Sequence, residues 1–122
     1  MIKKVFFLGL FLVLGLLFES KAQTKMMQVT TIESTVSGGL GRSKMLITHD
    51  DGKTEEQDLE NLFSMVGINF KNITGNENTI MKTLKKYTTE GWRLVSVTPL
   101  TVSPTQSTNV GIFMTRYLLV KD

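Results

Sequence analysis

A helix that stops at a glycine and leads straight into a strand constrains the fold of this chain more than any other stretch. Residues 76–90 predict an amphipathic helix, because apolar side chains recur at helical spacing with lysines between them. Asn76 or Asn78 is expected to cap its first amide groups. The stripe that faces the core is expected to consist of Ile80, Leu84 and Tyr87.

Gly91 occupies the position after this helix, where a left-handed backbone ends a helix at little cost. Trp92 follows at the position whose side chain packs back on the last turn, and Tyr87 is its expected partner. Residues 93–98 predict a strand with apolar residues on both faces, which favours an interior position in a sheet. The junction therefore sets the angle between helix and strand, and Gly91 is architectural rather than catalytic.

The remaining strands are indicated by β-branched residues and turn signals. Residues 26–36 and 44–48 predict two strands. The Asp-Gly pair at 51–52 predicts a hairpin turn in which both central residues take positive φ, and residues 54–58 are expected to run back from it. Residues 110–120 are long, apolar and rich in strand formers, and predict the last strand.

Residues 59–66 predict a second, short helix, because their apolar residues have helical spacing and Gly67 follows where a helix would end. These apolar residues are Leu59, Leu62, Phe63 and Val66. Residues 68–74 are expected to be irregular. The elements together predict an α+β fold, a small antiparallel sheet of about four to five strands packed against one main helix and one short helix.

The N-terminus has the three parts of a secretory signal peptide. Two lysines precede an uncharged apolar run of 14 residues, and residues 20–22 place small side chains at the cleavage positions. That run is shorter than the roughly 18 to 20 residues of a spanning helix, which favours cleavage over an uncleaved anchor. We therefore expect a signal peptide at 1–22 and a single domain at 23–122, exported to the periplasm or beyond, with membrane contact only before cleavage.

Charge and cysteine content exclude several classes of function. The precursor has 14 basic and 11 acidic residues, and loss of residues 1–22 removes three lysines and one glutamate, so that the net charge falls from +3 to +1. The mature domain therefore lacks the concentrated basic face that nucleic acid requires. The absence of cysteine excludes disulfides and thiolate metal sites, so packing must supply the stability.

The stretch "LKKYTTEGWRLVSVTPL" and, after a loop, "GIFMTRYLLVK" read as a helix, an E-G-W-E-L-V-S-V-like strand and a final strand. In these features the C-terminal 45 residues or so resemble a family of short bacterial domains of unknown function. Residues 37–75 look like an insertion, of a kind similar to that of longer, exported members, and Arg93 stands where the pattern usually has an acid. The resemblance implies the fold and export but carries over no catalytic residue.

The chain has two stretches that superficially suggest catalysis or ligand binding. His49 is the single histidine, and Asp50, Asp51, Glu55 and Glu56 lie near it; a metal or acid–base site is one interpretation, but a solvated hairpin turn is favoured. The glycine-rich residues 38–43 lead into a strand rather than a helix, which favours a plain turn over a phosphate site. Both stretches favour plain turns, and the chain has no Gly-x-Ser-x-Gly nucleophile elbow. We therefore expect no enzymatic activity, no cofactor and no bound metal.

The functional hypothesis that remains is a non-catalytic protein-interaction module of the cell envelope. Its partner is expected to be an envelope or extracellular protein, or a second copy of the chain. The final strand offers a possible sheet edge for such pairing, although a long apolar strand more often completes a sheet. The candidate interaction residues are Ile112, Phe113, Met114, Arg116 and Tyr117.

The alternative hypothesis is a carrier of a small apolar ligand, held in a groove lined by Trp92, Phe63 and Phe70. An enzyme acting through the His49 turn comes third. The sequence does not distinguish these partners, the oligomeric state, periplasm from extracellular space, or the role of residues 37–75.

Overall fold

The computed structural model describes residues 23–36, 43–103 and 111–122. The predicted signal peptide, most of the glycine-rich stretch at 38–43 and residues 104–110 of the loop before the last strand lie outside the described residues. Within them, no helix is long and apolar enough to span a membrane.

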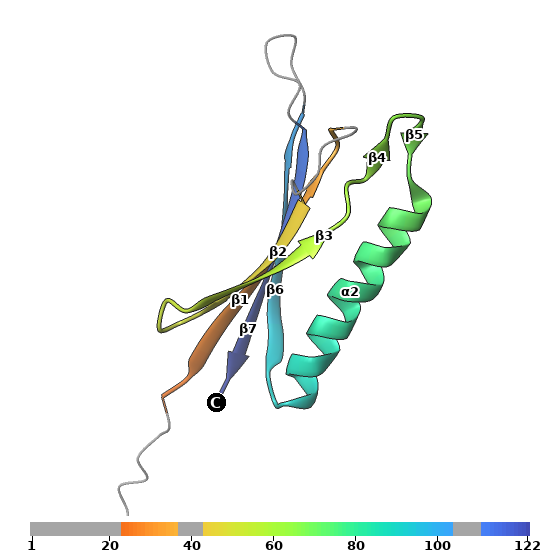
Figure 1. Cartoon of the computed structure of the whole chain (residues 1–122). Helices are drawn as coiled ribbons and strands as arrows, with labels where there is room; N and C mark the ends of the chain where they lie inside the picture. Colours follow the sequence, from red (N-terminus) through yellow and green to blue (C-terminus); the bar gives the residue numbers. More distant parts are fainter. Residues whose placement is uncertain (1–22, 37–42, 104–110) are drawn as a thin grey trace, which may run out of the picture.

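A five-stranded antiparallel sheet with a helix against one face forms this part of the chain (Figure 1). The strand order is β3-β2-β1-β7-β6, and a separate two-stranded sheet, β4-β5, precedes the helix. The elements are β1 Lys25–Ser34, β2 Ser43–His49, β3 Thr54–Leu59, β4 Phe63–Ser64, β5 Gly67–Ile68, α2 Phe70–Thr89, β6 Arg93–Val102 and β7 Ile112–Lys121. The predicted combination of an antiparallel sheet with one main helix is thereby confirmed.

The core lies between this sheet and α2, and alternation along the strands supplies it. In β1, Met27 and Val29 are buried on the side of the sheet that faces α2. The register of the ladders brings the other core strands into line with them, since Met27 is opposite Leu119 of β7 and Val29 is opposite Ile47 of β2. The buried core residues are Met27, Val29, Met45, Ile47, Leu59, Ile80, Tyr87 and Leu119.

The end of α2 confirms the predicted junction. Gly91 has a φ of 96° and donates its amide to the carbonyl of Thr88 at 3.2 Å, while the Trp92 amide donates to the carbonyl of Tyr87 at 3.0 Å. These two bonds define a Schellman motif, which uses the carbonyl groups that the helix leaves unpaired. Trp92 also packs against the core cluster that contains Tyr87. β6 therefore begins in a fixed direction, one turn after the helix ends.

The start of α2 differs from the prediction. The helix begins at Phe70, and the side chain of Asn69 caps it by accepting a hydrogen bond from the amide of Asn72 at 3.1 Å. The prediction of a cap at Asn76 or Asn78, and of an irregular stretch at 68–74, was wrong. Tertiary contacts override the weak local preference of this glycine- and asparagine-rich segment. The helix is extended toward β4 and β5 as a result.

The predicted short helix at 59–66 is also absent from the structure. Leu59 is the last residue of β3 and is buried there, so it reaches the core from a strand. Phe63 and Ile68 pair across the small β4-β5 hairpin. Val66 lies at its tip and is 97% exposed, which means that the apparent helical stripe faces no common surface. Helical spacing over eight residues was outweighed by these strand pairings.

The turn between β2 and β3 is a hairpin, as predicted, but of a different geometry. The Gly52 amide donates to the carbonyl of His49 at 3.0 Å, and the His49 amide donates to the carbonyl of Lys53 at 2.8 Å. Gly52 has a φ of 85°, whereas no non-glycine residue among those described has positive φ. Asp51 therefore does not take the left-handed conformation that the Asp-Gly pair suggested, and Gly52 alone supplies it.

A buried asparagine joins α2 to the sheet. Asn76 is 1% exposed; its side-chain oxygen accepts from the Glu60 amide at 2.8 Å. Its side-chain nitrogen donates to the Glu60 carbonyl at 2.8 Å and to Glu33 Oε1, on β1, at 3.0 Å. A buried amide with all these partners is stabilising, whereas the same amide without them would be costly. Asn76 therefore fixes how α2 lies over β1 and the segment after β3.

Replacing glycine by alanine is expected to have opposite effects on stability at Gly75, within α2, and at Gly91, just after it. Gly91→Ala is expected to lower the free energy of unfolding by about 1 to 2 kcal/mol, because alanine is strained at positive φ. Gly75→Ala is expected to raise it by about 1 kcal/mol, because Gly75 lies within the helix and a methyl group there meets nothing within 4 Å. Urea unfolding of both variants provides the measurement, and equal shifts would contradict the assigned cap.

Asn76→Ala is expected to lower the free energy of unfolding by about 2 kcal/mol, because it removes three hydrogen bonds and leaves both Glu60 backbone groups without this partner. Asn78→Ala, at an exposed position of the same helix, is the matched control and should change it by less than about 0.5 kcal/mol. Thermal and urea unfolding of the two variants compare them. If Asn76→Ala lowers the free energy of unfolding no more than Asn78→Ala does, Asn76 does not anchor the helix to the sheet.

Candidate interaction surface

Of the last two strands, β7 lies in the interior of the sheet and β6 lies at its edge. β7 lies between β1 and β6, and it pairs with β1 along all ten residues of each strand. Residues 111–120 therefore do not offer a sheet edge, and the favoured interpretation, that this strand completes the sheet, is confirmed. The prediction that residues 93–98 form an interior strand was wrong. β6 is the last strand of the sheet and has β7 as its single neighbour among the described strands.

β6 forms an edge whose whole length is accessible. All ten of its residues are exposed, and five of them are large apolar residues. Of the ten, Arg93 alone carries a charge. These apolar residues are Leu94 at 43% exposure, Val95 at 44%, Val97 at 51%, Leu100 at 44% and Val102 at 53%. We call residues Arg93–Val102 the β6 edge.

The exposed apolar residues of the β6 edge lie on both faces of the sheet. Leu94 is opposite the core residue Leu119, which places it on the face that α2 covers. Leu100 is opposite Met114, on the other face, which we call the open face. A bulge between Leu94 and Ser96 shifts the register in between. Apolar side chains on both faces of this strand therefore stay about half exposed.

The five predicted interaction residues of β7 divide between the two faces. Phe113 and Tyr117 point toward the side of α2, because they alternate with the core residue Leu119. Tyr117 packs against the core, whereas Phe113 is 44% exposed. The other three lie on the open face, where Ile112 and Met114 are next to apolar residues of the β6 edge and Arg116 is next to Thr98. The predicted set is therefore not one surface, although part of it continues the β6 edge.

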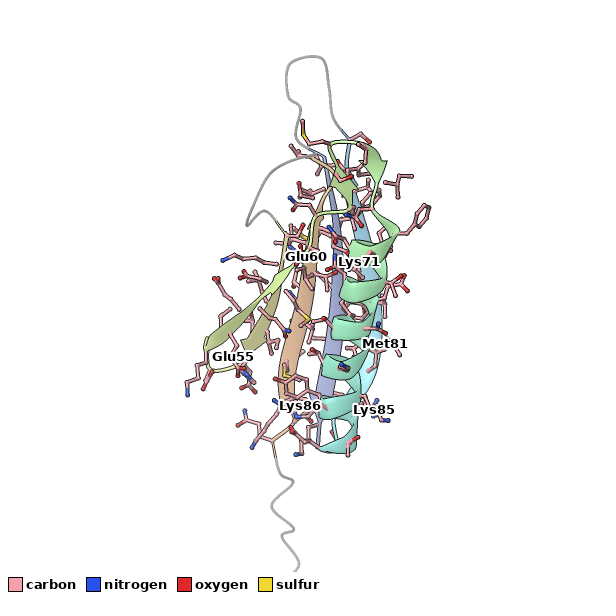
Figure 2. The ribbon with its side chains drawn as sticks, turned by 45° about the vertical axis from the view of Figure 1, so that its right-hand side comes forward. Glu55, Glu60, Lys71, Met81, Lys85 and Lys86 are labelled. Carbon is pink, nitrogen blue, oxygen red and sulfur yellow. The ribbon has the colours of Figure 1, made fainter. Side chains whose placement is uncertain are left out.

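The opposite edge of the sheet, β3, is acidic. Lys44 Nζ and Glu56 Oε2 are 2.7 Å apart, and this contact raises the pKa of the exposed Lys44 amine. Asp58 and Glu55 are exposed on the same strand, and Figure 2 shows Glu55 on the hairpin at the β3 side of the molecule. Charged side chains discourage a sheet edge from pairing with another chain. β6 lacks that protection, so the two edges of one sheet differ in character.

Trp92, Phe63 and Phe70 do not meet, so the predicted ligand groove was wrong. Phe63 belongs to the small hairpin before α2, and Phe70 is the first residue of that helix and is 74% exposed. Trp92 follows its other end, and a helix of 20 residues is about 30 Å long. Trp92 is instead covered by the core on one side and by Lys121, whose Nζ lies 6.0 Å from the ring centre.

The His49 turn has the geometry of a hairpin end. His49 Nε2 lies 3.3 Å from Glu55 Oε1, across the β2-β3 pair. Asp51 accepts a hydrogen bond from the Lys53 amide at 2.9 Å, and Asp50 accepts one from the Met26 amide at 3.2 Å. The two aspartates therefore close the turn and bind the end of β1. Among the described residues, no group of three or more histidine, cysteine, aspartate or glutamate side chains is placed to hold a metal ion.

Pro99 is a sequence signal for an edge strand that the prediction of an interior strand did not take into account. The predicted strand ends at residue 98, just before Pro99, whereas the strand of the structure runs through Pro99 to Val102. A proline cannot donate to a ladder, so within sheets it is found on edge strands with its nitrogen directed away from the neighbouring strand. A strand containing Pro99 was therefore more consistent with an edge than with the interior.

Comparison with known proteins adds no relative. The chain matches no protein-family model, no curated protein and no solved structure. The resemblance to a family of short bacterial domains stays a prediction.

Tyr117 gives this region a measurable pH dependence. Burial raises the pKa of its phenol above the ordinary value of 10.0, and the negative charges of Glu33 and Glu77 raise it further. The folded protein therefore holds this proton more tightly than the unfolded chain does, so stability is complete below about pH 10 and falls as the pH rises through the folded pKa. Because the pKa of Tyr87 is also raised, by burial and by Glu55, the wild type should lose stability through both residues.

Tyr117→Phe is expected to reduce the loss of stability at alkaline pH, because it removes the contribution of Tyr117. Tyr87→Phe is expected to remove the contribution of Tyr87. The measurement is urea unfolding at neutral pH and at about pH 11, with the tyrosinate absorbance followed in parallel. A wild type and a Tyr117→Phe variant that lose the same stability between the two pH values would contradict the assignment.

Proposed function

We propose that the mature chain is an exported, non-catalytic interaction module that binds another protein chain through the β6 edge. The observation that carries the proposal is the exposure of all ten residues of β6, with apolar side chains on both faces. Export is supported by the signal-like pattern of residues 1–22. The proposed site lies on β6 and the adjoining open-face residues of β7, rather than on an edge formed by β7 itself.

The energy available at this edge indicates how a partner binds. Covering the exposed half of one valine or leucine is worth about 1 kcal/mol, so the five apolar side chains together supply about 5 kcal/mol. Association itself costs about as much or more. A partner must therefore add hydrogen bonds to the free backbone groups of β6, which is the mode by which an extended segment joins a sheet edge.

A charged double variant of the β6 edge is expected to abolish binding while leaving the fold intact. Val97→Lys and Leu100→Lys place one charge on each face, at side chains that are 51% and 44% exposed. Gln57→Lys, at an exposed position of the β3 edge, is the matched control. Each tagged protein is crosslinked in the cells that produce it, captured and identified by mass spectrometry.

The proposal expects a crosslinked chain, either a different protein or a second copy, that wild type and Gln57→Lys retain and the double variant loses. Capture that is the same for all three proteins, or capture of nothing, would contradict it. Far-ultraviolet circular dichroism and urea unfolding show whether the double variant is folded. The intact mass of the recovered wild type tests export separately, because cleavage after Ala22 leaves Gln23 as the first residue.

A further inference from the structure

The hairpin of β4 and β5 and the first residue of α2 carry the most exposed apolar side chains of the described chain. Residues 61–70 (NLFSMVGINF) contain no charged residue. Three of their side chains are more exposed than any other large apolar side chain that the structure describes. The exposed fractions are 97% for Val66, 83% for Met65, 74% for Phe70 and 54% for Ile68. We call residues 65–70 the apolar tip.

We propose that the apolar tip docks the mature chain on the surface of a lipid bilayer that contains anionic lipids. The tip enters the boundary between headgroups and acyl chains, and the rest of the domain stays outside. This surface is separate from the β6 edge, so the inference goes beyond the proposed function. It also differs from the sequence-based expectation that membrane contact ends when residues 1–22 are cleaved.

Hydrogen bonds at its base hold the hairpin in one position. The Leu62 amide donates to the carbonyl of Ser34, at the end of β1, at 3.0 Å, and the Asn69 amide donates to the Leu62 carbonyl at 2.9 Å. The side chain of Asn72, on α2, donates to the Asn61 carbonyl at 3.0 Å. The hairpin is therefore a braced projection at the start of α2 (Figure 1), and a braced anchor loses little conformational freedom on docking.

The shape of the apolar tip favours a bilayer over a protein or a small ligand. Its side chains belong to a turn and to a helix end, and exposed fractions as high as those of Met65 and Val66 mean that they project from the molecule. Sites for small ligands are concave, which this end is not. A protein partner would need a matching apolar cavity, whereas acyl chains adapt to a projecting apolar group.

The hairpin also pairs polar backbone groups internally, as an environment without water requires. Phe63 pairs with Ile68, and Ser64 pairs with Gly67, across the two strands. Ser64 Oγ accepts a hydrogen bond from the Val66 amide at 3.4 Å and donates one to the Gly67 carbonyl at 3.3 Å. These bonds lower the cost of moving the hairpin out of water, because a bonded polar group loses less on leaving water than an unbonded one.

The charges beside the apolar tip match an anionic surface. α2 begins at Phe70, so the positive end of its dipole lies at the tip, and its first turn contains no acidic residue. Lys71 follows directly, at this end of the helix (Figure 2), and a lysine beside an apolar anchor extends its amine to the headgroups. The backbone of Glu60, the nearest acid along the chain, binds Asn76, more than one turn beyond Lys71.

Vesicle binding of the mature chain tests the inference. Residues 23–122 contain every described element and lack the apolar run of the signal-like segment, which would bind lipid by itself. The probes are vesicles of phosphatidylcholine with phosphatidylglycerol, an anionic lipid, and vesicles of phosphatidylcholine alone. Flotation is expected to recover the wild type with the anionic vesicles and to recover less of it with the neutral ones.

The Met65→Ser, Val66→Ser double variant is expected to bind the anionic vesicles about tenfold or more weakly, because it removes the apolar anchor. Both side chains are exposed, so the fold should be unchanged, and urea unfolding checks this. Met81→Ser is the matched control and should bind as the wild type does. Met81 is also exposed, at 64%, but it lies in the middle of α2 (Figure 2).

Two charge reversals that give the same net charge test the orientation. Lys71→Glu is expected to weaken binding to the anionic vesicles about fivefold or more, because Lys71 lies at the bilayer surface. Lys85→Glu, toward the other end of α2, should weaken it less. Equal losses for the two variants would contradict the placement of this helix end at the bilayer.

A single labelled cysteine tests insertion directly, since the chain has no cysteine of its own. A polarity-sensitive fluorophore on Val66→Cys is expected to shift its emission to the blue when anionic vesicles are added, and to be shielded from a quencher in the water. The same fluorophore on Gln57→Cys, on β3, is the control and should show neither change.

The inference fails if the wild type floats with neither kind of vesicle, if the double variant binds as the wild type does, or if the label at residue 66 stays in contact with water on the bound protein. A wild type that ignores vesicles but captures a protein through the apolar tip would likewise replace the bilayer by a protein partner. The proposed function fails separately, because its crosslinking experiment uses substitutions in the β6 edge, and none of these lies in the apolar tip.

Discussion

The pairing of β1 with β7 is the interaction on which the rest of the structure depends. It joins residues 25–34 to residues 112–121, so that strands near opposite ends of the described chain form the centre of the sheet. β2 and β3 extend the sheet on one side, and β6 extends it on the other. β6 pairs with β7 and with no other described strand, so it is the outer strand on this side, and the candidate site follows from this order.

The placement of α2 depends on contacts in its N-terminal half and at its C-terminal end. Asn76, in its N-terminal half, bonds to Glu60 and to Glu33 of β1, so the helix has a polar attachment to the sheet as well as an apolar one. The Schellman motif at Gly91 reverses the chain within one turn and delivers it to β6. These contacts fix the helix over the sheet, with β6 leading directly out of its C-terminal end.

The different character of the two sheet edges gives the clearest view of function. Natural sheets protect edges with charges, bulges and prolines, because an unprotected edge pairs with other chains. β3 uses charges and β6 uses a bulge and Pro99, but β6 retains exposed apolar residues on both faces. Such a combination admits pairing at few registers and excludes most others. This combination is the basis of our proposal that β6 binds one specific partner.

The sequence by itself determined the elements whose signals are local: the end of α2 at Gly91, the packing of Trp92 near Tyr87, the β2-β3 hairpin and the long last strand. Tertiary structure alone decided the early start of α2, the strand pairing of residues 59–68 and the order of the strands. Propensity and periodicity describe only neighbours along the chain, whereas the β1-β7 ladder joins residues far apart in sequence. For that reason the apolar pattern of residues 93–98 suggested an interior strand, and only the fold showed that β6 has one neighbour among the described strands.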